Sequence, residues 1–291
     1  MREAIWALAQ FDRADVRARF STEAAPRYGV FHAGWRNLLL GRIIEVQGAA
    51  ANPVLVDQFH RNSAAIADAF AGSASPYLAS YPGKAWPADA VVAMASLGFH
   101  DRLFGPGHRD VIMRWVAQVR DRLDDHGLIP HAWEPEQDRV RQDARGSSMA
   151  LMNAFLPMID TALAADQYMW YRKWFLVEPL GVPVLREYPH DAGGAADADS
   201  GPVILGVGGA ATLVNAAAAR ANDQTIQAHV ADAVAEALCF GTGGDQRRYL
   251  FGTMPIADLF IAWGRSVPPA RPEHPSTAFK EFHIWSLGLF L

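Results

Sequence analysis

Carboxylates stand in the loops that precede the most apolar segments of this sequence. Asp89 lies in YPGKAWPADA, and Asp197 and Asp199 lie in DADSGPVILGVGGAAT. Two carboxyl groups across one cavity can serve as general acid and general base if their surroundings separate their pKa values. An apolar wall raises the pKa of one group, and a neighbouring arginine lowers that of the other. We therefore predict Asp89 and Asp199 as a catalytic pair.

Tyrosines, tryptophans, an arginine and a histidine accompany these acids in the same loops. Either Tyr188 or Tyr249 can donate a hydrogen bond to a leaving hydroxyl, and we predict Tyr188 as the third catalytic residue. The predicted substrate-binding residues are Tyr81, Trp86, Arg145, Glu187, Asp197, Tyr249, His32 and Trp35.

A structural role is the alternative for each of these residues. Asp199 is a preferred residue type for a helix N-cap, and Asp89 falls in a first turn, where the helix dipole favours an acid. Arg145 has Glu187 as a candidate partner for a simple ion pair. The aromatic residues and His32 are of types often found in a hydrophobic core.

The elements that must position these residues are helices, since apolar residues recur at spacings of three and four nearly throughout. No segment alternates with period two over enough residues to predict a sheet, and 181–189 is either a short strand or an extended loop. The predicted helices are 1–20, 29–46, 53–70, 87–104, 108–125, 147–160, 162–177, 200–221, 224–239, 255–265 and 276–290.

The predicted helices alternate in character along the chain. Those at 87–104, 147–160, 200–221 and 255–265 are poor in charge, whereas the intervening ones carry charges on one face. A helix that is apolar all round is buried, and one with a polar face meets solvent. The alternation predicts an all-α fold with inner and outer rings of helical hairpins, an (α/α)5–6 toroid that forms a single domain over 1–291. An open solenoid would give the same pattern.

The segment 195–223 has three interpretations: a membrane span, a nucleotide-binding loop or a buried helix. Its apolar run is long enough to span, but it consists of Ala and Gly and lacks a positive flank. The sequence GVGG at 206–209 lacks the G-x-G-x-x-G spacing and a preceding strand. We therefore predict a buried helix that begins near Pro202, with Ser200 or Asp199 as its N-cap.

The composition of the chain and the motifs that it lacks limit the partners and cofactors that we expect. The net charge is −5 and the pI is near 6.0, so nucleic acid and anionic lipid are poor candidates. A single cysteine, Cys239, excludes an intrachain disulfide, and the sequence has no HExxH, P-loop or G-x-S-x-G motif. We expect no cofactor, no metal site, no membrane span and a small-molecule substrate. The oligomeric state stays open, a homo-oligomer included.

The amino-terminal segment 1–20 is amphipathic and charged, unlike a signal peptide. The expected compartment is therefore the cytoplasm, or the periplasm if a leader is removed, and the sequence does not decide between them.

Four blocks of the sequence resemble a bacterial family related to linalool dehydratase/isomerase, over about residues 75–265. They are YPGKAWPADAVVAMASL, ARGSSMALMNAFLPMID, REYP and DADSGPVILGVGGAAT. The resemblance implies an (α/α) toroid with a deep apolar cavity, and cofactor-independent addition or removal of water at a small terpene alcohol. The family's enzyme uses cysteines in its site, whereas this sequence has only Cys239, so the substrate stays open.

Three functions are compatible with these patterns. The first is a lyase or isomerase that hydrates or dehydrates a small, mostly apolar alcohol such as a terpenoid by acid–base catalysis. The alternative is a carbohydrate-active enzyme, a glycoside hydrolase or polysaccharide lyase, by analogy of fold. The third is a non-enzymatic binding domain. An aromatic, nearly uncharged pocket would favour the first, and an open groove with several acids would favour the second.

Overall fold

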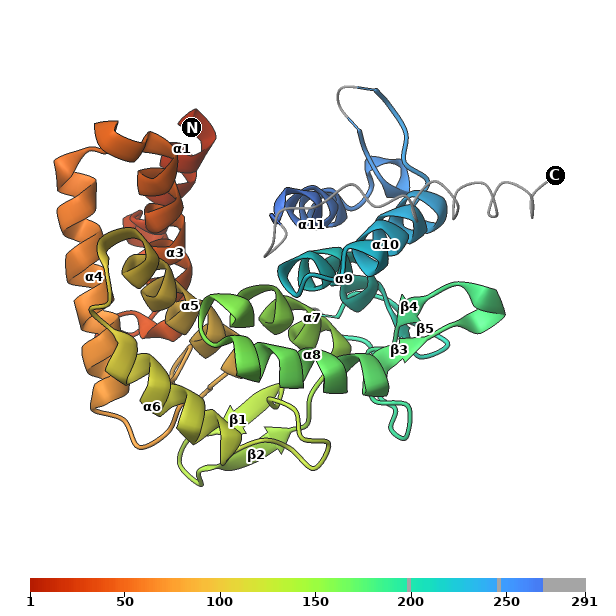
Figure 1. Ribbon diagram of the computed structural model, residues 1–291, viewed down its shortest axis with the longest axis horizontal. Coiled ribbons are helices and arrows are strands. Elements are labelled where there is room, and N and C mark those ends of the chain that lie inside the picture. The colour runs from red at the N-terminus through yellow and green to blue at the C-terminus, as the bar shows by residue number, and fades with distance from the viewer. Residues whose placement is uncertain (198–199, 245–246, 269–291) are drawn as a thin grey trace.

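The computed structural model describes residues 1–197, 200–244 and 247–268, and the chain is mostly helical as predicted (Figure 1). The predicted helix 276–290 lies outside the described residues. The helices, in chain order, are α1 (Arg2–Phe11), α2 (Ala14–Arg17), α3 (Gly29–Gln47), α4 (Pro53–Ala71), α5 (Pro87–Phe104), α6 (Arg109–Arg120), α7 (Gly146–Phe155), α8 (Thr161–Phe175), α9 (Gly209–Ala221), α10 (Thr225–Leu238) and α11 (Pro255–Ser266).

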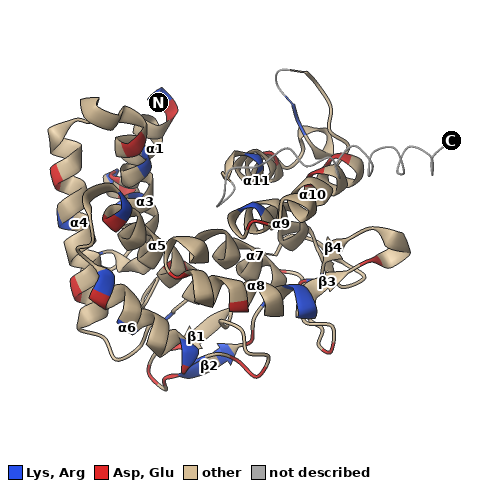
Figure 2. Cartoon of the chain, in the orientation of Figure 1, with Lys and Arg blue, Asp and Glu red and all other residues tan. Residues whose placement is uncertain are grey.

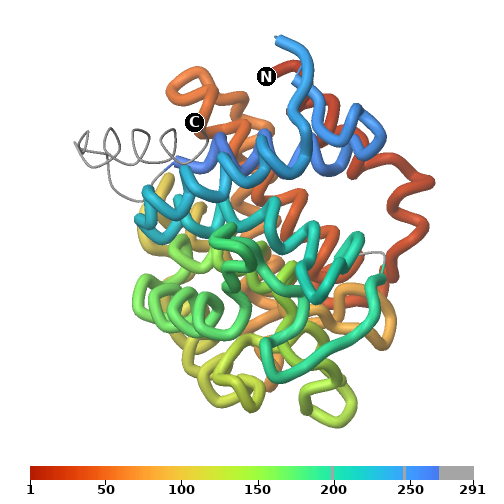
Figure 3. Tube along the Cα trace, turned by 90° about the vertical axis from the view of Figure 1, so that its right-hand side faces the viewer, coloured from red at the N-terminus to blue at the C-terminus, as the bar shows by residue number. Residues whose placement is uncertain are grey.

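The odd-numbered helices from α3 to α11 pack against one another in sequence. α3 contacts α5, α5 contacts α7, α7 contacts α9, and α9 contacts α11. The even-numbered helices α4, α6, α8 and α10 each cover a neighbour from this series. The turned view shows the blue and cyan C-terminal helices, the green α7–α8 region and the yellow-green β1–β2 region one below another (Figure 3). By these contacts the odd-numbered helices from α3 to α11 form an inner row, and the even-numbered helices from α4 to α10 form an outer row packed against it.

The charge content of α5 and α7 in the inner row differs from that of α6 in the outer row. α5 is buried along most of its length and carries its charged residues near its ends, and α7 contains no charged residue (Figure 2). By contrast, α6 buries one stripe, Ile112, Trp115, Val116 and Val119, and exposes charged residues elsewhere. Close packing in the inner row depends on small residues: a Cβ added at Gly34 of α3 would stand 2.8 Å from Ala93 of α5.

Three two-stranded antiparallel ribbons interrupt the helices, where the sequence predicted no sheet. They pair β1 (Ala132–Glu134) with β2 (Arg139–Gln142), β3 (Leu176–Val177) with β4 (Val184–Leu185), and β5 (Val203–Ile204) with β6 (Val207–Gly208). β4 falls inside the segment 181–189 that was expected to be extended.

The predicted helix over 200–221 is wrong in its first part. Residues 203–208 form the β5–β6 hairpin, and α9 begins only at Gly209, with Gly208 as its N-cap. Leu205 and Gly206 both have positive φ, as a two-residue hairpin turn requires, and β-branched residues flank them. Neither Ser200 nor Pro202 therefore starts this helix.

The single helix predicted over 1–20 is also wrong in its second half, because α1 ends at Phe11 and the short α2 follows it.

One large hydrophobic cluster extends from α1 to α9, and a smaller one lies among α9, α10 and α11. Among the described helices none is long and apolar enough to cross a membrane, in keeping with the expected absence of a span.

Candidate functional site

The leading ends of α3, α5, α7 and α9, together with the middle of α11, line a cavity of about 500 Å³. Phe31 and Trp35 come from the start of α3, Asp89 from the first turn of α5, and Phe260 from α11. Its remaining described lining residues are Tyr81, Trp86, Ala88, His131, Ser147, Ser148, Leu151, Ala210 and Val214. Five of the lining side chains are Phe, Tyr or Trp, so most of the wall is aromatic or aliphatic.

Four of the residues predicted from the sequence line this cavity together: Trp35, Tyr81, Trp86 and Asp89. Asp89 is 8% exposed, and it lies in the first turn of α5 directly after the loop that carries Trp86. Pro87 begins that helix, where its missing N–H leaves no intrahelical bond unmade. The aromatic loop and the acid are therefore placed together by one helix start.

A second cavity of about 710 Å³ lies elsewhere, between α8 and the turn from α9 to α10. Its lining includes Tyr168, Arg172 and Asn222 and none of the predicted site residues. The smaller cavity is therefore the candidate site, because it gathers the acid, the aromatics and the starts of the inner helices.

His131 is a lining residue that sequence reasoning missed. It precedes β1, and its Nδ1 lies 3.2 Å from Ser148 Oγ, which donates its own proton to the Arg145 carbonyl oxygen at 3.1 Å. This arrangement assigns a proton to Nδ1 and leaves Nε2 as an acceptor. Burial, helped by the nearby positive charge of Arg145, lowers the pKa of His131 to about 4. At neutral pH the ring is therefore uncharged.

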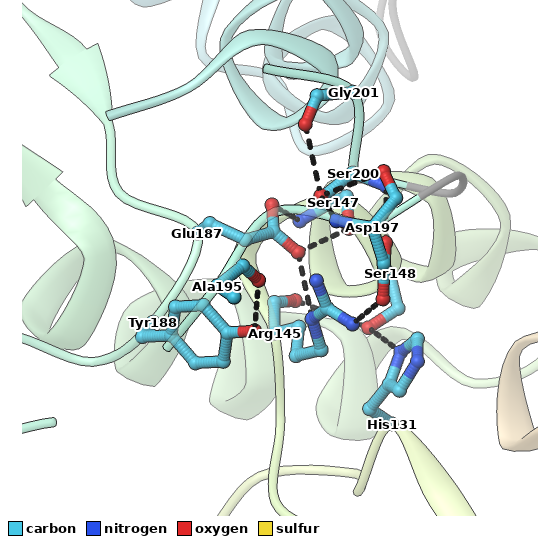
Figure 4. Close-up of polar contacts among 10 residues, drawn as sticks. All are labelled: His131, Arg145, Ser147, Ser148, Glu187, Tyr188, Ala195, Asp197, Ser200 and Gly201. Carbon is cyan, nitrogen blue, oxygen red and sulfur yellow. Dashed lines mark hydrogen bonds and ion pairs between the residues drawn. The ribbon is translucent and has the colours of Figure 1, made fainter. Parts of the chain in front are cut away.

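An ion network lies directly behind the serines at the start of α7 (Figure 4). Arg145 Nε donates to Glu187 Oε1 at 2.9 Å, and Arg145 Nη1 pairs with Asp197. The Ser147 hydroxyl donates to Glu187 Oε1 at 2.7 Å. Three of the predicted binding residues, Arg145, Glu187 and Asp197, thus contact one another, in the pairing that was the structural alternative for Arg145.

The pKa values of the two acids in this network, Glu187 and Asp197, are shifted in opposite directions. Glu187 is 0% exposed, and burial raises its pKa, although hydrogen bonds from Ser147 and the charge of Arg145 oppose the rise. Burial also acts to raise the pKa of Asp197, but hydrogen bonds from Arg145 and Ser200 outweigh it and lower that pKa strongly. Asp197 is therefore a fixed negative charge at neutral pH, held beside Arg145.

Backbone contacts hold Glu187 in place. Gly146 N donates to the Glu187 carbonyl oxygen at 2.8 Å, and Glu187 N donates to the Gly206 carbonyl oxygen at 3.0 Å. A Cβ added at Gly146 would stand 2.0 Å from the Arg186 carbonyl oxygen, and one added at Gly208 would stand 2.8 Å from Glu187 Oε2. The start of α7 and the β5–β6 hairpin therefore pack so closely against residues 186–187 that Gly146 and Gly208 leave no room for a side chain.

The other predicted residues lie apart from the cavity wall. Tyr188 donates its hydroxyl to the Ala195 carbonyl oxygen at 2.8 Å, and its ring lies 5.1 Å from the Arg145 guanidinium (Figure 4). His32 is buried, with Nε2 3.0 Å from the Phe11 carbonyl oxygen. Asp199 lies outside the described residues.

Tyr249 belongs to a different cluster. Its hydroxyl donates to Glu236 Oε1 at 2.7 Å and contacts Arg265 Nη1 at 2.5 Å, in the smaller hydrophobic cluster of α9, α10 and α11. The structure thus separates the two tyrosines that were considered as hydrogen-bond donors.

Sequence reasoning missed His131 altogether, whereas it expected the loop that carries Ser147 and Ser148 to reach the cavity but left both serines out of the predicted binding residues. The serines stand in the leading loop QDARGSS, so their place before an apolar helix was an available signal. His131 stands alone in LIPHAW, and only the β1–β2 ribbon and the Ser148 contact bring it to the cavity.

No known protein-family model matches this chain, and no curated protein matches its sequence significantly.

Proposed function

We propose that the protein is a cofactor-independent lyase or isomerase that adds water to, or removes it from, a small, mostly apolar alcohol in the 500 Å³ cavity. The observation that carries the proposal is the composition of the wall. Five aromatic side chains surround a single carboxylate, Asp89, among the described lining residues. A pocket of this kind favours a compact apolar ligand held by few polar groups.

Asp89 and His131 replace the originally predicted acid pair in this proposal. Asp89, in its carboxylic acid form, donates a proton to the substrate hydroxyl while the C–O bond breaks and water leaves. His131 Nε2 accepts a proton from the neighbouring carbon, and that C–H electron pair becomes the new double bond. The two groups then return to their starting forms by exchanging one proton through solvent. Hydration is the same sequence reversed.

The surroundings of His131 suit its role as the base. A neutral imidazole with a free Nε2 can accept a proton, and Ser148 holds the ring by its Nδ1. Positive charge that develops on carbon would face the rings of Trp35 and Trp86, and aromatic faces attract cations. Arg145 and Glu187 act behind them by fixing the start of α7, so they are positioning residues in this scheme.

The inner and outer rows support the proposal of an (α/α) toroid. Trp35 of α3 packs 5.6 Å from Phe155 of α7, and Phe155 stacks 5.6 Å from Trp263 of α11, all measured between ring centroids. Aromatic side chains thus link the first and last inner helices across the interior. The likeness to the family related to linalool dehydratase/isomerase, carried by the four blocks quoted above, points to the same fold and reaction class.

A carbohydrate-active enzyme is the weaker candidate. An inverting hydrolase needs two carboxyl groups facing one substrate, and the described cavity lining supplies one. A retaining hydrolase has the same requirement at shorter separation.

The test is a thermal-shift screen of small alcohols, terpenoid alcohols and oligosaccharides, followed by product detection by gas chromatography and mass spectrometry. We expect a terpenoid-sized alcohol to stabilise the protein and to give an alkene. Asp89→Asn and His131→Asn should each lower kcat by about 10²–10⁴-fold, the usual contribution of one acid or base.

Asp110→Asn is the matched control, because Asp110 also lies in a first helical turn but is exposed on α6. It should keep full activity. Oligosaccharide turnover would support the alternative function. Ligand binding that neither cavity variant changes, without turnover, would support the non-enzymatic binding domain.

A further inference from the structure

A group of histidines and an aspartate lies between α4, α5 and α6, apart from the cavity. His100 and Asp101 are in the last turn of α5, and His108 immediately precedes α6. One nitrogen of each histidine and one carboxylate oxygen of Asp101 all lie within 4.8 Å of one another. The chain brings His108 back to α5 by leaving the helix at Gly105, whose φ of +95° suits a glycine.

Two ring nitrogens in this group are buried and have no hydrogen-bond partner among the described residues. They are His100 Nδ1 and His108 Nε2. His100 is only 8% exposed, and the nearest acid oxygen to its Nδ1 is Asp101 Oδ1 at 3.5 Å, at the outer limit of a hydrogen bond. Buried polar atoms are nearly always partnered, so two unpartnered ring nitrogens within one His–Asp–His group need an explanation.

We propose that His100, Asp101 and His108 bind a divalent transition-metal ion of the zinc type. Two imidazole nitrogens and one carboxylate oxygen are a common ligand set for this ion, and water would complete the coordination. The proposal departs from the sequence analysis, which expected no metal site, because the spacing in HDRLFGPGH matches no motif considered there.

The neighbours of these residues are those that a metal site needs behind its ligands. His60 Nδ1 lies 2.8 Å from His100 Nε2, so a proton on His100 Nε2 leaves its Nδ1 lone pair for the ion. Asp101 Oδ1 accepts backbone N–H groups of Gly107 and His108, each at 3.0 Å. These bonds fix the carboxylate in place. The ion would tie the end of α5 to the start of α6, with His60 of α4 supporting His100, and would take no part in the proposed reaction.

The experiment uses the full chain after treatment with a chelator, titrated with Co²⁺ and with Zn²⁺. We expect one ion per chain by elemental analysis, visible d–d absorption for Co²⁺, and a higher melting temperature with Zn²⁺. His60→Phe, which removes the supporting hydrogen bond, should weaken affinity by about 10–100-fold. His108→Asn, which removes a ligand, should weaken it at least as much.

His190→Asn is the control, because His190 is exposed and lies outside this group. It should bind both ions like the unchanged protein. His108 is half-buried in a loop, so His108→Asn should melt normally without metal and lose only the stabilisation by Zn²⁺. Equal binding by His108→Asn and the unchanged protein, or no binding of either ion at micromolar concentrations, would overturn the proposal.

Discussion

Two glutamates in the second half of the chain each accept hydrogen bonds from arginine and from a hydroxyl, but they differ in burial. Glu187 is 0% exposed and is bonded by Arg145 and Ser147. The Glu236 side chain is 32% exposed and is bonded by Arg247, Arg265 and Tyr249. Nearly the same chemical groups therefore meet in two different dielectric environments.

The difference appears in the pKa values of the two acids. Burial raises the pKa of Glu187 despite its partners. For Glu236 the hydrogen bond from Arg247 dominates and lowers the pKa to about 2. A buried ion pair is costly to break, because one partner is left without water, whereas an exposed pair contributes little. The Glu187 network therefore fixes geometry beside the cavity, and the Glu236 network is open to solvent at its carboxylate and its arginines.

The strongest test of this comparison removes one arginine from each network. Arg145→Met should lower the free energy of unfolding by about 3–5 kcal/mol, because Glu187 would remain buried without its charge partner. Arg265→Met should lower it by about 1 kcal/mol or less, since solvent reaches Glu236. Urea unfolding at neutral pH measures both, and similar losses would remove the distinction between the networks.

The pH dependence of stability tests the cavity side of this comparison, because His131 changes its pKa on folding. Its pKa falls from 6.5 to about 4 on folding, so the folded state binds fewer protons than the unfolded state between these values. Stability should be full above pH 6.5 and should decrease, by at most about 3 kcal/mol, as pH falls toward 4. His131→Asn should remove this part of the pH dependence in urea unfolding, and His190→Asn should retain it.

The two glutamates should shift stability with pH in opposite directions. Since the pKa of Glu187 is raised, its contribution to stability is present at low pH and is lost as pH rises through and above 4.5. The pKa of Glu236 is lowered, so its contribution is present above 4.5 and is lost as pH falls toward 2. For Glu236 solvent screening limits this to about 1 kcal/mol. Comparing Glu187→Gln with Glu236→Gln across this range measures both signs, and slopes of the same sign would contradict the assignment.

Changes in ionic strength should have the smallest effect on the stability differences between the variants and the unchanged protein. Raising ionic strength screens exposed charges far more than buried ones. The stability difference between Arg265→Met and the unchanged protein should shrink by a few tenths of a kcal/mol at high salt. The difference for Arg145→Met should stay constant, and an equal salt response from both variants would indicate that water reaches Glu187.

The sequence predicted most helices because their apolar residues recur at helical spacing. Pro87 and Pro255 each begin a helix at its predicted first residue. The β5–β6 hairpin was missed because its residues are as uncharged as those of α9, and its turn depends on Leu205 as well as Gly206. Leucine rarely adopts positive φ, so no local preference indicated that turn.

The candidate site was predictable where one loop carried several of its residues. Trp86 and Asp89 precede and begin one helix, so their convergence followed from the order of the chain. His131 was not predictable, because a tertiary contact with Ser148 places it. The pairing of Arg145 with Glu187 was anticipated only as an alternative, since 42 residues separate them in sequence.

The tight seating of Glu187 has a consequence for how this protein can diverge through evolution. A Cβ added at Gly208 would stand 2.8 Å from the Glu187 carboxylate, and one added at Gly146 would stand 2.0 Å from the Arg186 carbonyl oxygen just before it. Descendants that keep the arginine–glutamate pair should therefore keep both glycines, while the residues around Glu236 drift freely. Loss of either glycine would mark lineages in which the support behind Ser147 and Ser148 was rebuilt and in which a different ligand should be sought.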